Sequence, residues 1–303
     1  MITSVFVRQE GTFCDFNGKE SWVILTPIEQ SIKRKIEAVG TPLKDWDIQI
    51  NYGIKTGYNE AFIIDTAKRD EILANCKTEE ERQRTAELIR PILRGRDIKR
   101  YSYDWANLWL IWIPWHFPLH FDNSIQGASE KAEKAFTEQY PAVYNHLLQY
   151  KSKLSARNKA ETGIRYEWYA LQRWGANYWE DFNKPKIVWG NLNLQASFTL
   201  VDDASFINAP SPMIVPASKY LLAVLNSKIS DYYIRQLGVT RNGGYFEYKP
   251  MFVEKLPVPK KICEKSMRIL VTLVDSRDET GIDKEVYRLY GLTDEEISFI
   301  ETQ

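Results

Sequence analysis

Apolar residues recur at every third or fourth position in several segments of the chain, and this spacing predicts amphipathic helices. The longest regular stripe runs through residues 218–237, with Ser218 placed to cap its start and Gly238 to end it. Residues 26–39 follow the same rule, with Thr26 as the cap and Pro27 at the first helical position. We also predict helices over residues 68–90, over residues 129–154 with a break at Tyr140-Pro141, and over residues 263–274, 283–289 and 293–301.

Shorter apolar runs between turn residues predict strands. They cover residues 105–115, 186–191, 196–201 and 252–258, with two more strands around a glycine-rich turn in residues 47–65 and a small hairpin in residues 1–25. Helices and strands do not alternate regularly along the chain. The pattern therefore predicts an α+β fold with mixed, irregular small β-sheets and packed helices, and not a doubly wound sheet.

Charge changes this picture only through its distribution. The chain of 303 residues has 40 Lys and Arg and 40 Asp and Glu, so its net charge is zero. Residues 151–260 hold 15 basic and 9 acidic residues, whereas residues 275–303 hold 9 acidic and 3 basic ones. A neutral total thus combines a basic middle with an acidic tail, and the middle is the better candidate for a polyanionic partner.

Cysteine usage and hydropathy limit the class of protein. Cys14, Cys76 and Cys263 are far apart and form no CxxC pair, which fits a reducing compartment and argues against a structural zinc site. No apolar run approaches the roughly 18 residues that a membrane helix needs, and the first residues do not read as a signal peptide. We expect a cytoplasmic protein without a membrane partner.

Catalytic signatures are scarce. His116 and His120 are four residues apart, but Pro118 between them prevents a shared helix face. The chain has no HExxH, no GxSxG and no glycine-rich phosphate loop, so we assign it no catalytic residue, no metal and no cofactor of its own. Asp97-Ile98-Lys99 has the acid-x-lysine form found in many metal-dependent nucleases, and this alternative stays open.

Basic and aromatic residues are interleaved in segments that could contact nucleic acid. The four segments are residues 53–60, 90–100, 151–173 and 241–249. Cations can hold phosphates, arginine can pair with guanine, and asparagine or glutamine can pair with adenine. Each segment could instead be a solvated turn or part of the core. The DNA-binding candidates are Lys55, Thr56, Asn59, Arg94, Arg96, Arg157, Arg165, Gln172, Arg173, Asn191, Asn193, Arg241, Asn242, Tyr245 and Lys249.

An ordered set of motifs resembles a known family. The motifs are GIKTGYNEAFIID, RPILRGRDIKRY, YPAVYNHLLQYKSKLSAR, WYALQR, KPKIVWG, YLLAVLNSKISDYYI and GGYFEYKPMFVEKLPVP, followed by the tail IDKEVYRLYGLTDEEISFIE. In this order they resemble the TaqI-like C-terminal specificity domain, which is the target recognition domain of adenine-N6 DNA methyltransferases and Eco57I-like type IIG restriction-modification enzymes. The resemblance covers most of the chain from about residue 48 onward.

The resemblance implies a target-recognition-domain-like fold and a module that reads double-stranded DNA. It implies that a separate methyltransferase or endonuclease domain or subunit binds S-adenosylmethionine and performs the chemistry. We therefore expect a lead-in over residues 1–47, a recognition domain over residues 48–260 and a helical tail over residues 261–303. A competing interpretation is an accessory subunit that binds protein through the helix at residues 283–301.

Overall fold

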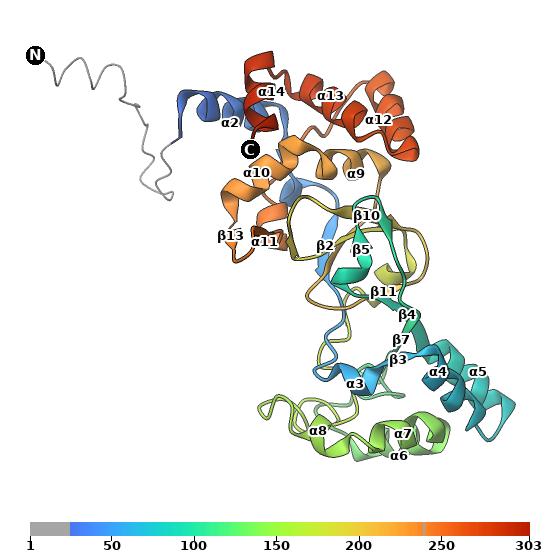
Figure 1. Ribbon diagram of the computed structural model, residues 1–303. Coiled ribbons are helices and arrows are strands. Elements are labelled where there is room, and N and C mark those ends of the chain that lie inside the picture. The colour runs from blue at the N-terminus through green and yellow to red at the C-terminus, as the bar shows by residue number, and fades with distance from the viewer. Residues whose placement is uncertain (1–24, 239) are drawn as a thin grey trace, which may run out of the picture.

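A sheet with strand order β10-β8-β12-β2 separates two hydrophobic cores in the computed structural model, which describes residues 25–238 and 240–303 (Figure 1). Successive side chains of a strand point to opposite faces. In β8 (Lys186–Trp189), Ile187 and Trp189 therefore enter one core and Val188 enters the other. The other strands are β2 (Gln49–Tyr52), β10 (Phe198–Val201) and β12 (Pro212–Val215).

Helices from both ends of the chain cover one face of this sheet, and we call this part the upper lobe (Figure 1). α2 packs beside α14, where Ser31 and Lys35 both donate to Glu296 at 2.7 Å. The first and last described helices thus close the same core. The upper-lobe helices are α2 (Pro27–Val39), α9 (Lys219–Asn226), α10 (Lys228–Leu237), α11 (Pro250–Val253), α12 (Glu264–Ser276), α13 (Glu279–Tyr290) and α14 (Asp294–Glu301).

The lower lobe is built on a second sheet, with strand order β11-β4-β7-β3. Its strands are β3 (Ile63–Asp65), β4 (Ile89–Leu93), β7 (Leu108–Ile111) and β11 (Phe206–Ile207). Its helices are α3 (Asn59–Phe62), α4 (Thr66–Ala74), α5 (Glu79–Leu88), α6 (Glu130–Gln139), α7 (Pro141–Leu148) and α8 (Lys151–Ser155). Residues 53–58 and residues 208–211 are among the connections that cross between this sheet and the central one.

Short strand pairs and turns complete the fold. β1 (Thr41–Pro42) pairs with β15 (Pro257–Val258), β5 (Ile98–Lys99) pairs with β6 (Ser102–Tyr103), and β14 (Tyr245–Glu247) lies between β13 (Thr240–Arg241) and β9 (Leu192–Asn193). The 3-10 turns are η1 (Leu43–Asp45), η2 (Gly95–Asp97) and η3 (Trp179–Asn183). The small mixed sheets and packed helices confirm the predicted α+β fold.

Several predicted boundaries are confirmed because side chains close them locally. At the start of α2, the Thr26 hydroxyl accepts a hydrogen bond from the Glu29 backbone amide, and the Glu29 carboxylate accepts one from the Thr26 backbone amide. Ser129 caps α6, and Pro141 begins α7 after the predicted break. Thr293 and Glu296 form the predicted capping box of α14.

Two segments predicted as single continuous helices are each divided into two helices. The helix predicted over residues 68–90 is two helices, because Thr78 accepts the amide of Glu81 and starts α5 anew. The helix over residues 218–237 divides at Ser227, which accepts the amide of Ser230. Both breaks follow from a hydroxyl that competes with the helical backbone for hydrogen bonds.

The two strands predicted in residues 47–65 are present as β2 and β3, but they belong to different sheets and the glycine-rich segment crosses between them. Another strand prediction needs correction. The strand over residues 252–258 is the short helix α11 followed by β15. The predicted hairpin at residues 1–25 lies almost wholly outside the described residues. No helix in the described ranges is long and apolar enough to cross a membrane.

Candidate nucleic-acid interface

An open hollow of about 690 Å³ lies where β5, β9 and residues 208–211 meet, and we call it the basic hollow. Arg96, Lys99 and Arg100 line it, and none of the described lining residues is an aspartate or a glutamate. The side chains of Arg96 and Lys99 are exposed and take part in no ion pair with a described residue. Its amide-bearing residues are Asn191, Asn193, Gln195 and Asn208, and Tyr245 completes the wall.

A second hollow, the turn hollow, continues from the first. It has a volume of about 440 Å³, is lined by residues 55–60, and shares Asn208 and Ala209 with the basic hollow. The Thr56 hydroxyl is buried and donates to Asn59 Oδ1 at 2.6 Å, which fixes the shape of the turn. The Lys55 side chain is exposed at its edge.

Because residue 53 is a glycine, the turn can pack closely against residues 207–209 of the same chain. A Cβ atom there would lie 2.3 Å from the carbonyl oxygen of Ile207, far inside van der Waals contact. The Gly53 amide donates to the carbonyl of Ser211 at 2.8 Å. Residues 53–58 and 208–211 are therefore held against each other, and the hollows form at their junction.

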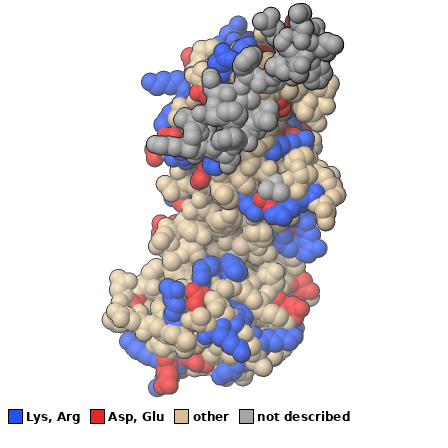
Figure 2. All heavy atoms as spheres, turned by 90° about the vertical axis from the view of Figure 1, so that its left-hand side faces the viewer, with Lys and Arg blue, Asp and Glu red and all other residues tan. Residues whose placement is uncertain are grey.

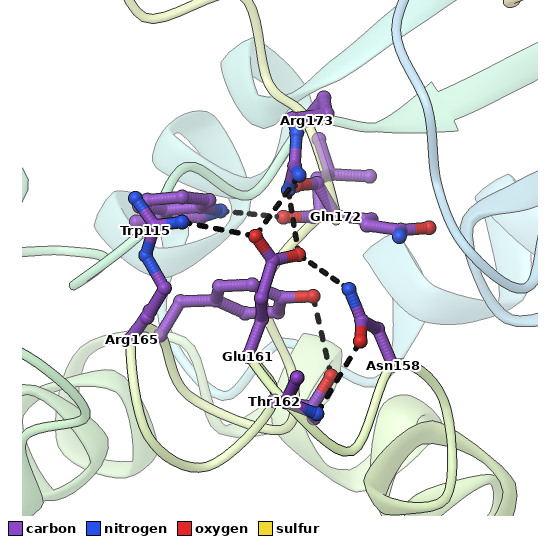
Figure 3. Close-up of polar contacts among 10 residues, drawn as sticks. Trp115, Asn158, Glu161, Thr162, Arg165, Gln172 and Arg173 are labelled. Atoms are coloured by element: carbon purple, nitrogen blue, oxygen red, sulfur yellow. Dashed lines mark hydrogen bonds and ion pairs between the residues drawn. The ribbon is translucent and has the colours of Figure 1, made fainter.

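Figure 3 shows a cluster of polar side chains around Glu161. The cluster borders the turn hollow through the Lys55–Arg173 bridge, in which the backbone amide of each residue donates to the carbonyl of the other, at 3.0 and 2.9 Å. Glu161 is buried and accepts two 3.0 Å hydrogen bonds from the Arg173 guanidinium and one from Arg165. The hydrogen bonds from Arg173 are the main cause of the lowered pKa of Glu161. Both guanidinium groups lie over the Trp115 ring, at 5.9 and 5.5 Å from its centre.

Gln172 differs from its neighbours in this cluster. Figure 3 shows its side-chain amide pointing away from Glu161. It lies close to the Gly57 backbone, because a Cβ at Gly57 would be 3.0 Å from Gln172 Oε1. The Gln172 side-chain amide thus lies beside the turn hollow, whereas Arg165 and Arg173 are bound by the Glu161 carboxylate.

Arg157 and Arg94, like Arg165 and Arg173, have structural partners. The Arg157 guanidinium donates to the backbone carbonyls of Leu154, Thr56, Trp168 and Ala170, which uses four of its five N–H donors. Burial lowers the pKa of Arg157 to about 10. Arg157 therefore ties the turn at Thr56 to the lower lobe, a role that the basic composition of the segment did not indicate.

Arg94 is engaged by Asp97. Its Nε and Nη2 atoms donate to the two Asp97 carboxylate oxygens at 2.9 and 2.8 Å. Burial opposes ionisation of Asp97, but the Arg94 hydrogen bonds outweigh it and the pKa of Asp97 is lowered. Asp97 thus closes the η2 turn, and no group of His, Cys, Asp or Glu in the described part of the chain is arranged to hold a metal ion. The Asp97 carboxylate is thus engaged by Arg94 in this structure, and the nuclease alternative stays an untested prediction.

The β13–β14 hairpin carries the remaining candidates. Arg241 Nε donates to Glu247 at 2.6 Å, and Lys249 Nζ lies 2.9 Å from the other Glu247 oxygen. Glu247 is buried, and hydrogen bonds from Lys249 and Arg241 lower its pKa. Asn242 is exposed at the hairpin turn, and Tyr245 reaches the basic hollow.

The structure thus brings distant candidates together in part. Arg96, Asn191, Asn193 and Tyr245 share the basic hollow, and Lys55, Thr56 and Asn59 share the adjoining turn hollow. On the face that it draws, Figure 2 shows patches of lysine and arginine above and below a band of mostly uncharged residues. Sequence reasoning left out Asn208 and Gln195, because single amides in loops carry no local signal.

Two Type II methyltransferases are similar to this chain in sequence. The chain is 22% identical to the Type II methyltransferase M.MjaIV of Methanocaldococcus jannaschii over 78% of this chain and 76% of that protein. It is 19% identical to the Type II methyltransferase M.PaeR7I of Pseudomonas aeruginosa over 93% of this chain and 45% of that protein.

A solved structure shares the fold. The Type IIL restriction-modification enzyme MmeI, solved in complex with DNA, matches with a TM-score of 0.50 and 14% identity. The match covers 86% of this chain but only 36% of MmeI. Residues 90–258 match the TaqI-like C-terminal specificity domain. Because this match spans more than half of the sequence, the chain belongs to the TaqI-like C-terminal specificity domain family.

Proposed function

We propose that this chain recognises a specific sequence in double-stranded DNA, as the specificity module of a restriction-modification or adenine-N6 methyltransferase system. The observation that carries the proposal is the basic hollow, where exposed cations lie beside side-chain amides and none of the described lining residues carries a carboxylate. Cations of this kind neutralise phosphates, and amides can read base edges. The family and the methyltransferase relatives support the same role.

The chemistry that follows recognition is proposed for another domain or subunit. The chain spans 36% of MmeI and 45% of M.PaeR7I, so those enzymes contain much that this chain does not match. We infer that methyl transfer from S-adenosylmethionine, or DNA cleavage, takes place outside residues 1–303. The described residues assigned here hold DNA and are assigned no role toward that cofactor.

The salt dependence of DNA binding tests the proposal. The full chain is titrated with labelled duplexes of random sequence, and with a duplex selected from a random library, while salt rises from about 50 to about 200 mM. Because each phosphate contact releases counterions, Arg96 and Lys99 alone should give a log-log slope near −1.8, and further contacts should steepen it. A flat salt response, or equal affinity for selected and random duplexes, would contradict sequence-specific DNA binding.

A further inference from the structure

Asn208 lies at the junction of the basic hollow and the turn hollow, and it lines both of them. It follows β11, whose two residues pair with the end of β4, and it precedes the turn into β12. No pattern in the sequence marks it, since it is a single amide in the stretch Ile207–Pro210 with no basic or aromatic neighbour.

The backbone at Asn208 is fixed from both sides. The Asn208 amide donates to the carbonyl of Leu93 at 2.8 Å, and the next amide, of Ala209, donates to the carbonyl of Ile54 at 2.9 Å. The Ile54 amide in turn donates to the carbonyl of Ile207 at 2.7 Å. A side chain on such a backbone starts from a defined position, as base-edge recognition requires.

The Asn208 side chain has no partner within the described protein. On the same hollow, the Asn193 side chain is occupied, since it donates to the Gly190 carbonyl at 2.7 Å, whereas the buried Asn191 Oδ1 has no partner among the described residues. Asn208 is half-buried, and its side-chain amide makes no hydrogen bond to any described residue. It therefore presents a donor and an acceptor side by side to the hollows.

An amide of this kind matches one base in particular. Adenine shows an acceptor, N7, beside a donor, the N6 amino group, in the major groove, and an asparagine can bond both at once. Arg96 and Lys99 stand on the same hollow, where they could hold the flanking phosphates. We propose that Asn208 is a specificity-determining residue that reads an adenine at one position of the recognised DNA sequence. This inference rests on the proposed function and deepens it.

The test is a selection experiment on the full chain. A random duplex library is enriched on the wild-type protein and on the Asn208→Ala variant, and the base preference at each position is compared. Loss of a two-bond contact should reduce the preference for adenine at one position by between about fivefold and about a hundredfold, and leave the other positions unchanged. Because the amide has no protein partner, the melting temperature should stay within about 1 °C of the wild type.

Two further variants separate the possible results. Asn75→Ala removes an exposed amide at the end of α4, away from both hollows, and should change no base preference. Asn208→Asp keeps the size but offers only acceptors, so the preference at the same position should move from adenine toward cytosine.

The outcomes distinguish the two proposals. A wild-type protein that selects a sequence, with Asn208→Ala and Asn208→Asp selecting the same sequence at every position, overturns the role of Asn208 and leaves the proposed function standing. A wild-type protein that selects no sequence overturns both.

Discussion

The basic hollow and a larger hollow near the C-terminus meet at Arg100 and Gln195, yet they differ in how their charges are neutralised. The C-terminal hollow, of about 820 Å³, is lined mainly by α10, α13 and α14. Three of its four cations have carboxylate partners, namely Arg100 with Glu279 at 2.7 Å, Lys228 with Glu301, and Arg288 with Glu285, whereas Lys284 has none among the described residues. In the basic hollow only Arg100 of the three cations is paired, so the fraction of cations with a carboxylate partner distinguishes the two hollows.

The C-terminal hollow also holds a carboxylate with little compensation. Asp283 is buried and accepts the Lys228 backbone amide at 2.8 Å. Burial is the main cause that raises the pKa of Asp283 to about 6, against the attraction of Arg100 and Lys228. This hollow thus contains a buried carboxylate whose charge is disfavoured, whereas Arg96 and Lys99 on the basic hollow are exposed and unpaired among the described residues.

Reversing the two unpaired cations of the basic hollow should have the largest effect on DNA binding. The double variant Arg96→Glu, Lys99→Glu should weaken DNA binding by about a hundredfold and lower the salt slope by about 1.8, because two phosphate contacts become repulsive. The matched control is Lys284→Glu, an exposed lysine on the C-terminal hollow, which should change affinity less than about threefold. Fluorescence anisotropy measures both. Equal losses in the two variants would show that the hollows do not differ in function.

Asp283→Asn should separate stability from binding. The folded pKa of Asp283 is raised above its ordinary value, so the native state binds the proton more tightly than the unfolded chain, and wild-type stability falls as pH rises from about 4 to about 6. The amide variant does not titrate and can still accept the Lys228 amide. It should therefore gain about 1–3 kcal/mol in the free energy of unfolding at pH 7, with little gain near pH 4.

Urea unfolding at both pH values measures this gain, and DNA affinity of the variant should equal that of the wild type. A variant that is less stable at pH 7 would show that the Asp283 charge stabilises the fold.

Arg241→Ala should have the smallest effect, and it tests whether the DNA interface extends to the β13–β14 hairpin. Lys249 still compensates Glu247 after the change, so the free energy of unfolding should fall by less than about 1 kcal/mol. If the hairpin contacts phosphate, DNA affinity should fall about two- to fivefold. The control Arg268→Ala removes an exposed arginine paired with Glu264 on α12 and should leave affinity unchanged. Thermal melting and anisotropy together decide, and a large drop in melting temperature would make Arg241 structural.

The sequence predicted best where structure depends on near neighbours. Apolar spacing and caps gave α2, α6 and α14 with nearly correct starts, because a cap and its amide are three residues apart. Continuity was harder, as Ser227 shows. A serine inside an apolar stripe reads as helical, but here its hydroxyl accepts the Ser230 amide and starts a new helix.

Candidate site residues were predicted by type and not by environment. Arg96 and Arg94 are two residues apart and look equivalent in the sequence, yet Arg94 is held by Asp97 and Arg96 is exposed. Arg157 read as a base-contacting residue and instead binds four backbone carbonyls. The base-reading roles of the remaining candidates stay predictions.

The sequence by itself determined the family, the α+β class and the basic character of the middle of the chain, since these depend on ordered motifs, periodicity and charge. Only the tertiary structure decided which cations lack a carboxylate partner and which amides lack a protein partner. It also decided that residues 53–58 and 208–211 cross at one junction and open the two hollows there. The physical reason is distance: caps form between near neighbours, whereas the environment of a charge or an amide is set by groups up to a hundred or more residues away.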